Sequence, residues 1–262
     1  MDIHNLTAKE RKKIHTWLRA LIQLLYFIFI PSVYTAAFAG VKYIFTQIGA
    51  GEKVAMTSFV TVLLVICLYT MVFGRFFCGF VCAFGAFGDA LHALYTKACK
   101  KWKKKPVKIP EKAVWILGYM KYLVLLLIVL LCYSGVYGKA QGTSPWDVFS
   151  MLTAGRLPNS KYLVGIVLLV LIIVGMCTQE RFFCQFLCPM GAVFALMPIL
   201  PGALFRRNRE KCPPKCGLCK KRCPAHLDID GDTGRSGECL CCHACAAACP
   251  RKNIHIGTIE EK

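Results

Sequence analysis

The C-terminal part of the chain carries cysteines at spacings that suit iron–sulfur chemistry. One run occupies residues 212–224, another occupies residues 239–250, and each closes with Cys-Pro. The second run reads Cys-x2-Cys-x2-Cys-x3-Cys-Pro, a spacing at which thiolates hold four-iron clusters, and the first run has one extra residue. Zinc sites instead favour two separated Cys-x2-Cys pairs. We therefore predict two [4Fe-4S] clusters in this tail.

The bacterial two-cluster pattern also assigns the ligands. Three closely spaced cysteines hold one cluster, and the cysteine of each Cys-Pro ligates the other. Cluster A then takes Cys212, Cys216, Cys219 and Cys249. Cluster B takes Cys223, Cys239, Cys242 and Cys245. Cys212 is the least regular ligand because of the extra residue, and Cys241 is a spare thiol beside Cys242.

A different cysteine pattern occurs twice in the apolar part of the chain. The frame Arg-Phe-Phe-Cys-x-Phe-x-Cys covers residues 75–82 and again residues 181–188. Cysteines four apart share one face of a helix, so each pair can bind a metal centre. The thiols concerned are Cys78, Cys82, Cys184 and Cys188. Iron–sulfur and copper(I) both suit soft thiolates, and the alternative is neutral packing. The two arginines either stabilise thiolate charge or snorkel to the interface.

Hydrophobic stretches must position these cysteines. Of the 262 residues 56% are hydrophobic, which fits several membrane spans and one small domain. We predict four spans, at residues 17–38, 56–73, 113–133 and 162–176, with Pro31 as a kink in the first. Residues 138–160 are predicted to be a polar loop. A helical piece is expected after each cysteine pair.

The duplication predicts a mainly α fold with a four-helix membrane body built from two parallel repeats. Both cysteine pairs then lie at the same membrane face. The expected parts are an N-terminal segment (1–16), the membrane domain (17–205) and a bacterial-type two-[4Fe-4S] ferredoxin domain (206–262).

Basic residues predict the orientation. The N-terminal segment up to and including Arg19 contains five Lys or Arg residues, and the segment from Lys97 to Lys112 contains eight. The loops between the first and second spans and between the third and fourth spans contain few. The positive-inside rule then places the N-terminus, the tail and its clusters on the cytoplasmic side of a bacterial cytoplasmic membrane. The seventeen cysteines are not read as a disulfide scaffold, because those in the motifs are expected to be metal ligands in a reducing compartment. Cys67, Cys99, Cys132 and Cys177 lack partners at motif spacing and are read as packing residues. The net charge of +19 is assigned to loops that face membrane lipid, and not to nucleic acid.

The spans, the twin cysteine frames and the tail together resemble the NapH/NosR-type membrane-bound 4Fe-4S ferredoxins, from Trp17 to Cys249. The resemblance implies a quinol dehydrogenase-like component of an oxidoreductase complex. Its partners would be a quinone, a cytoplasmic electron donor and an extracytoplasmic flavin or cytochrome protein. The membrane motif of that family is Cys-x3-Cys-Pro, which Cys188-Pro189 matches and Cys82-Ala83 does not.

Three functions remain open at this point. The first is electron transfer through the tail clusters and the paired membrane cysteines, which could form a further iron–sulfur centre. The alternative is a copper-binding or copper-reducing protein that uses the same Cys-x3-Cys pairs. A redox sensor ranks last, because nothing in the sequence resembles an output domain.

Overall fold

The computed structural model describes residues 7–30, 32–107, 109–138, 143–200, 205–207, 212–213, 216–225, 227 and 237–256. In chain order the elements are α1 (Ala8–Phe29), α2 (Val33–Ala50), α3 (Ser58–Phe73), the π-helix η2 (Phe77–Val81), α4 (Ala83–Lys101), α5 (Glu111–Leu117), α6 (Met120–Tyr133), the 3-10 helix η3 (Val136–Gly138), α7 (Pro145–Thr153), the 3-10 helix η4 (Ser160–Tyr162), α8 (Leu163–Thr178), α9 (Phe182–Phe186), α10 (Pro189–Leu196), β1 (Phe205–Arg207), α11 (Leu218–Arg222), α12 (Ala244–Ala248) and β2 (Ile254–Ile256). The chain is mainly helical, as predicted.

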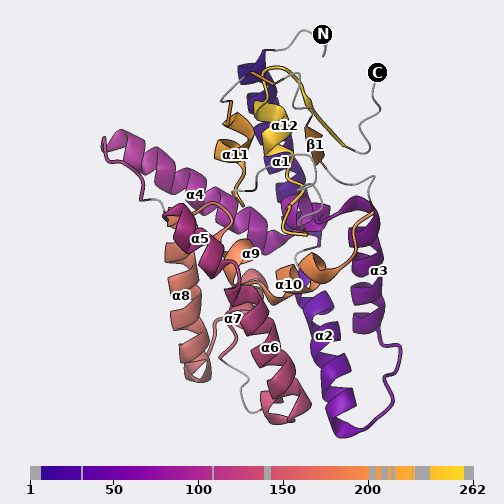
Figure 1. The fold of residues 1–262 in the computed structure, drawn as a ribbon. Coiled ribbons are helices and arrows are strands. Elements are labelled where there is room, and N and C mark those ends of the chain that lie inside the picture. The colour runs from indigo at the N-terminus through magenta and orange to yellow at the C-terminus, as the bar shows by residue number, and fades with distance from the viewer. Residues whose placement is uncertain are drawn as a thin grey trace.

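Apolar helices make up one end of the molecule. Figure 1 shows α2, α3, α6 and α8 there, and α1, α11, α12 and β1 at the opposite end. Two segments are long and apolar enough to cross a membrane, Ala113–Tyr133 and Ser160–Thr178, and α3 is a shorter apolar helix. These segments agree with three of the four predicted spans. A helix of about 20 residues is about 30 Å long, which matches the hydrocarbon core of a bilayer.

The predicted first span, residues 17–38, has the wrong bounds. Two helices cover this region, α1 and α2, and they are bent by 64° at the break between them. Pro31, the predicted kink, lies outside the described residues. If α1 and α2 are counted together as one broken span, the number of candidate membrane spans among the described residues rises from two to three. The polar side chains of Arg19 and Gln23 are buried on α1, where both donate hydrogen bonds to the Gly79 carbonyl of the first cysteine frame and to Asp89.

The predicted polar loop at 138–160 is also wrong in part. Residues 145–153 form α7, which begins with Pro145 after the N-cap Ser144. Ser144 accepts the backbone N–H of Asp147, a hydrogen bond that stabilises the first turn. Trp146 and Val148 are buried in the main core, and the helix packs against α8. Burial of these apolar side chains explains why the segment is ordered as a helix.

The tail is a small unit with a core of its own. β1 and β2 pair in antiparallel fashion, with Arg206 opposite His255, and α11 packs against α12. Cys219, Cys241, Cys245 and Ile254 form the buried core of this unit. It is not a free module, because α12 also packs against α1.

Candidate iron–sulfur and membrane cysteine sites

Four cysteines of the tail surround one small cavity. They are Cys223, Cys239, Cys242 and Cys245, the predicted ligands of cluster B. Cys223 caps the C-terminus of α11, Cys245 lies inside α12, and Cys239 and Cys242 lie in the stretch just before α12. One thiolate for each iron is the donor set of a [4Fe-4S] cluster, and these residues therefore fit that cofactor.

The backbone around this cavity has an unusual shape. Cys241 and His243 have positive φ angles, 46° and 57°, which are uncommon for residues other than glycine. Backbone concavities made by residues of this kind present N–H groups to anions and occur at iron–sulfur sites. The strained loop thus agrees with a site for an anionic cluster.

Burial affects the protonation of the cavity thiols. It raises the pKa of the Cys223 thiol to about 12, and burial with the neighbouring thiols of Cys242 and Cys239 also raises the pKa of Cys245. Metal ligands must be thiolates, so loading this site releases protons and its affinity depends on pH.

The predicted ligands of cluster A are only partly brought together. Cys219 lies in the tail core, and Cys249 packs against it. The Cys249 sulfur accepts the backbone N–H of Asn253 at 3.4 Å. Cys212 and Cys216 are half-buried, and residues 214–215 between them lie outside the described residues. The ligand roles of all eight tail cysteines stay predictions.

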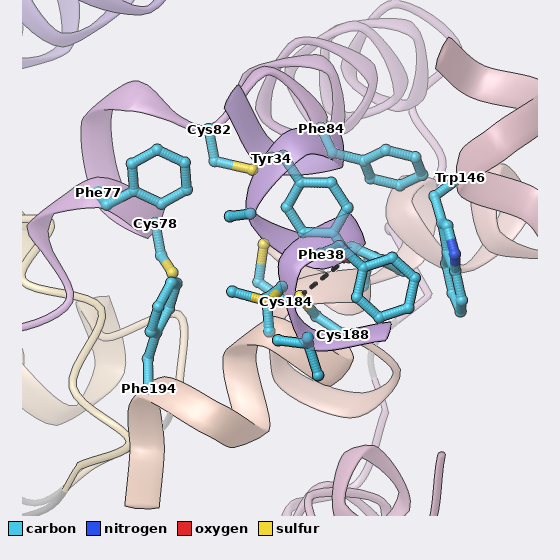
Figure 2. Close-up of a cluster of buried hydrophobic side chains, with 14 of the residues drawn as sticks. Tyr34, Phe38, Phe77, Cys78, Cys82, Phe84, Trp146, Cys184, Cys188 and Phe194 are labelled. Carbon is cyan, nitrogen blue, oxygen red and sulfur yellow. Dashed lines mark hydrogen bonds between the residues drawn. The ribbon is translucent and has the colours of Figure 1, made fainter. Parts of the chain in front are cut away.

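The two cysteine pairs of the apolar part lie in a single buried core. Cys78, Cys82, Cys184 and Cys188 are all buried there among aromatic side chains, as Figure 2 shows. The first pair comes from η2 and its C-cap, and the second from α9 and the residue before α10. A single-turn π-helix such as η2 is rare and often marks a functional site.

The second cysteine of each pair begins a helix. Cys82 is the N-cap of α4, and Cys188 is the N-cap of α10. The Cys188 sulfur accepts the backbone N–H of Gly191 at 3.2 Å, and it lies 3.7 Å from the Tyr34 hydroxyl (Figure 2). Helix N-termini favour negative charge, so both positions suit a thiolate.

The spacing of the ligands bears on the kind of centre. In the part of the chain that the structure describes, no three His, Cys, Asp or Glu side chains are placed to hold one metal ion. A four-iron cluster takes one thiolate for each iron, so its ligands stand further apart than those of a single ion. A single copper ion gains no support from this arrangement.

The two arginines of the cysteine frames do not snorkel. Arg75 is 1% exposed and Arg181 is 2% exposed. Arg181 donates to the carbonyl oxygens of Cys78 and Gly79 and forms an ion pair with Asp89 at 2.6 Å. Arg75 donates to the Gly237 carbonyl at 3.1 Å and lies 3.6 Å from the Glu238 carboxylate. The interface alternative is therefore wrong, because both guanidinium groups point into the protein.

Each arginine reaches into the other half of the chain. A Cβ atom on Gly191 would lie 2.9 Å from Arg75 Nη2, and one on Gly85 would overlap Arg181 Nη1. Both glycines stand ten residues after the arginine of their own frame. The absence of a side chain at Gly85 and Gly191 is thus what admits the opposite arginine.

The tail rests directly on the first cysteine frame. A Cβ on Gly79 would lie 2.6 Å from the Leu240 carbonyl oxygen, so only glycine allows this approach. The His243 ring meets Phe76 and Phe80 edge-on, with ring centroids 6.3 and 5.8 Å apart. Leu240 and His243 both line the cluster B cavity. The predicted cluster B site and the membrane frame are therefore in contact.

Polar residues that the sequence reasoning missed secure this contact. Glu238 accepts hydrogen bonds from Tyr122, at 2.7 Å, and from the buried Lys121. The Lys121 ammonium and the other hydrogen bonds hold the pKa of the Glu238 carboxyl below its usual value, although burial opposes this shift. Gln185 and Gln179 donate to the Pro224 carbonyl on the other side of the tail.

Asp89 is a second missed residue. It forms ion pairs with Arg19, at 2.7 Å, and with Arg181, and it accepts a hydrogen bond from Gln23 at 2.8 Å. It ties α1, α4 and the second cysteine frame together. The sequence did contain a signal for this residue: Asp89 is the sole acidic residue between Glu52 and Glu111.

Two stretches of the chain, residues 55–106 and 162–211, match the family model described as a 4Fe-4S binding domain. Each stretch contains one membrane cysteine pair, and the tail cysteines follow the second stretch. No solved structure matches the chain.

Relatives of this chain include proteins of similar and of much greater length. An uncharacterized protein of Methanocaldococcus jannaschii is 29% identical over 87% of this chain and 88% of its own length. The putative electron transport protein YccM of Escherichia coli is 29% identical over 66% of this chain and 48% of its own. The regulatory protein NosR of Pseudomonas aeruginosa is 24% identical over 64% of this chain and 23% of its own. With the duplicated 4Fe-4S domain match, these relatives confirm the predicted resemblance: the chain is related to the membrane-bound 4Fe-4S proteins of the NapH/NosR type.

Proposed function

We propose that this chain is a membrane electron-transfer subunit. Electrons pass between two [4Fe-4S] clusters in the tail and a quinone or an extracytoplasmic redox protein, by way of the paired membrane cysteines. The observation that carries the proposal is the contact between the cluster B cavity and the first cysteine frame, where Leu240 meets Gly79. The printed name of YccM, a putative electron transport protein, supports the same role.

The proposed architecture has four spans in two parallel repeats. Three of the spans correspond to α3 and to the two long apolar segments, and α2 would be the first. The tail and the basic loop after α4 would lie on the cytoplasmic side, where reducing conditions preserve cysteine ligands. A cytoplasmic donor would reduce the tail, and an outer flavin or cytochrome protein would receive electrons.

The bound clusters would supply one-electron redox chemistry. The chain itself buries the ligands, excludes water with the aromatic side chains of Figure 2 and fixes the tail against the membrane part. Electron transfer is faster when redox sites are close together and held at a fixed distance. The packing of His243 on Phe76 and Phe80 would hold the cluster B site close to the first cysteine frame. Neither the relatives nor the described residues support the copper alternative.

The test is anaerobic purification of the full chain in detergent. Chemical analysis should find at least about eight iron atoms per chain, as two four-iron clusters require. After reduction with dithionite, mixing with a water-soluble quinone should bleach the EPR signals of the reduced clusters. The Cys242→Ser variant should lose about four iron atoms. A chain without iron, or with copper in its place, would overturn the proposal.

A further inference from the structure

In the described part of the chain, more cations than carboxylates are buried near the cysteine frames. Among the described residues, four buried cations lie near the cysteine frames: Arg19, Arg75, Lys121 and Arg181. Three carboxylates lie within 4.0 Å of them: Asp89, Glu180 and Glu238. Burial of an unbalanced cation is strongly unfavourable, so a further anion is expected in this core.

The arginines also have buried donors that meet no acceptor. Arg75 Nε and Nη2 and Arg181 Nε have no hydrogen-bond partner within the described part of the chain. Each guanidinium carries five donors in a fixed planar arrangement, and buried donors of this kind are normally satisfied. An anion beside both arginines would satisfy these donors.

The positions of the arginines identify that place. Arg75 interacts electrostatically with the thiols of Cys78 and Cys188. Arg181 interacts with Cys184 and Cys82. The Cys184 thiol also interacts with Arg75, so both arginines act on thiols of both frames. The glycine contacts agree with this, because a Cβ on Gly191 would lie 2.9 Å from Arg75 Nη2 and 3.3 Å from Cys188 Cβ.

The same arginines also interact with the cluster B site. Arg75 interacts electrostatically with Cys239, and Arg181 interacts with Cys242. Both guanidinium groups therefore interact with the membrane thiols and with a predicted ligand of cluster B. The Arg75 guanidinium also touches both parts, at Gly237 and Glu238 of the tail and at Gly191 of the membrane part.

We propose that the four membrane cysteines jointly hold one anionic iron–sulfur centre, and that Arg75 and Arg181 are its counterions and separate it from cluster B. This inference rests on the proposed function and specifies its membrane step. Four thiolates on an oxidised iron–sulfur core carry roughly two negative charges. They would balance the surplus of one buried cation and accept hydrogen bonds from the three unpaired guanidinium nitrogens. One electron passes from reduced cluster B, which is oxidised, to the membrane centre, which is reduced, and no bond forms or breaks. The arginines are positioning residues that set the potential of the acceptor.

Iron counts test the shared site. The full chain, purified anaerobically in detergent, should contain about ten to twelve iron atoms, that is, more than the tail clusters require. The double variant Cys78→Ser/Cys184→Ser should fall to about eight and lose one EPR signal. The matched control, Cys132→Ser, removes another thiol of the same core and should keep the full count. Wild-type protein with about eight iron atoms, unchanged in the double variant, would overturn this inference and leave the proposed function intact. If the Cys242→Ser variant kept all of its iron, that result would instead count against the proposed function.

Redox titration of the membrane EPR signal tests the counterions. Arg75→Gln and Arg181→Gln remove positive charge and should shift the midpoint to lower potential, because the reduced centre is the more negative state. Arg75→Lys should restore most of the shift, and Arg156→Gln, at an exposed position, should cause none. If a glutamine variant does not fold, Gly191→Ala displaces Arg75 Nη2 without a change of charge or ligand and should also lower the potential. An unchanged midpoint in these variants would refute the counterion role.

Discussion

Glu238 is expected to hold the tail on the membrane part, and the substitution Glu238→Gln tests this. The carboxylate meets Lys121, which is 0% exposed, and Arg75, which is 1% exposed. Loss of one partner of a fully buried ion pair costs about 3–5 kcal/mol, whereas exposed pairs contribute about 0–1 kcal/mol. The Glu238 side chain is 37% exposed, so we expect an intermediate value of about 2 kcal/mol.

Glutamine keeps the shape of the side chain and an acceptor for Tyr122, so the change isolates the lost charge. A difference of about 2 kcal/mol corresponds to roughly a 30-fold increase in the opening of the tail. Native-state hydrogen exchange, followed on peptides that contain residues 237–249, measures this opening directly. The amides of α12 should exchange faster by about that factor, while those of α8 should not change.

The control is Glu52→Gln, because Glu52 is an exposed carboxylate in the turn after α2. It should change exchange in the tail by less than about twofold, as surface substitutions usually do. If Glu238→Gln changes the exchange of residues 237–249 no more than Glu52→Gln does, the ion pairs do not hold the tail and the reasoning fails.

Three further predictions concern contacts of the same region. Gly79→Ala places a methyl group against the Leu240 carbonyl, so it should raise amide hydrogen exchange in the tail and slow the reoxidation of the clusters by quinone. The control Gly217→Ala adds a methyl group in open space and should change neither rate. Asp89→Asn leaves Arg19 and Arg181 buried without their carboxylate and should destabilise the protein by about 3 kcal/mol. The measurement is the melting temperature in detergent, which should fall. The control Asp147→Asn removes one partner of a more exposed ion pair and should lower the melting temperature much less. Cys223→Ser should remove about four iron atoms per chain and Cys241→Ser none; equal losses in both would mean that the ligand register is wrong.

Periodicity and composition predicted the apolar helices but not which of them face lipid. The stretch from Trp17 to Phe38 is apolar enough for a span, yet Arg19 and Gln23 stand four residues apart on one face of α1 and bind Gly79 and Asp89. An average over hydropathy hides such a polar stripe, and the i, i+4 spacing was the signal that could have revealed it.

The grouping of four tail cysteines could be predicted from the sequence, but their surroundings could not. Local spacing identified Cys223, Cys239, Cys242 and Cys245, and the structure places all four around one cavity. The partners of Arg75 and Arg181 could not be read in the same way, because they lie more than 100 residues away, at Gly237 and at Cys78. Contacts at such separations depend on how the halves pack, about which a single sequence carries little information.

The crossed arrangement of Arg75 over Gly191 and Arg181 over Gly85 has a consequence for the history of the chain. A precursor of half the length would carry one arginine, one glycine notch and one cysteine pair. In the present chain each guanidinium enters the glycine notch of the other half, so two copies of such a precursor would have to associate face to face to form the same contacts. The crossed contacts therefore predict that the two halves associate without a covalent link: expression of residues 1–106 and 107–262 as separate polypeptides should yield a stable product when both are made together.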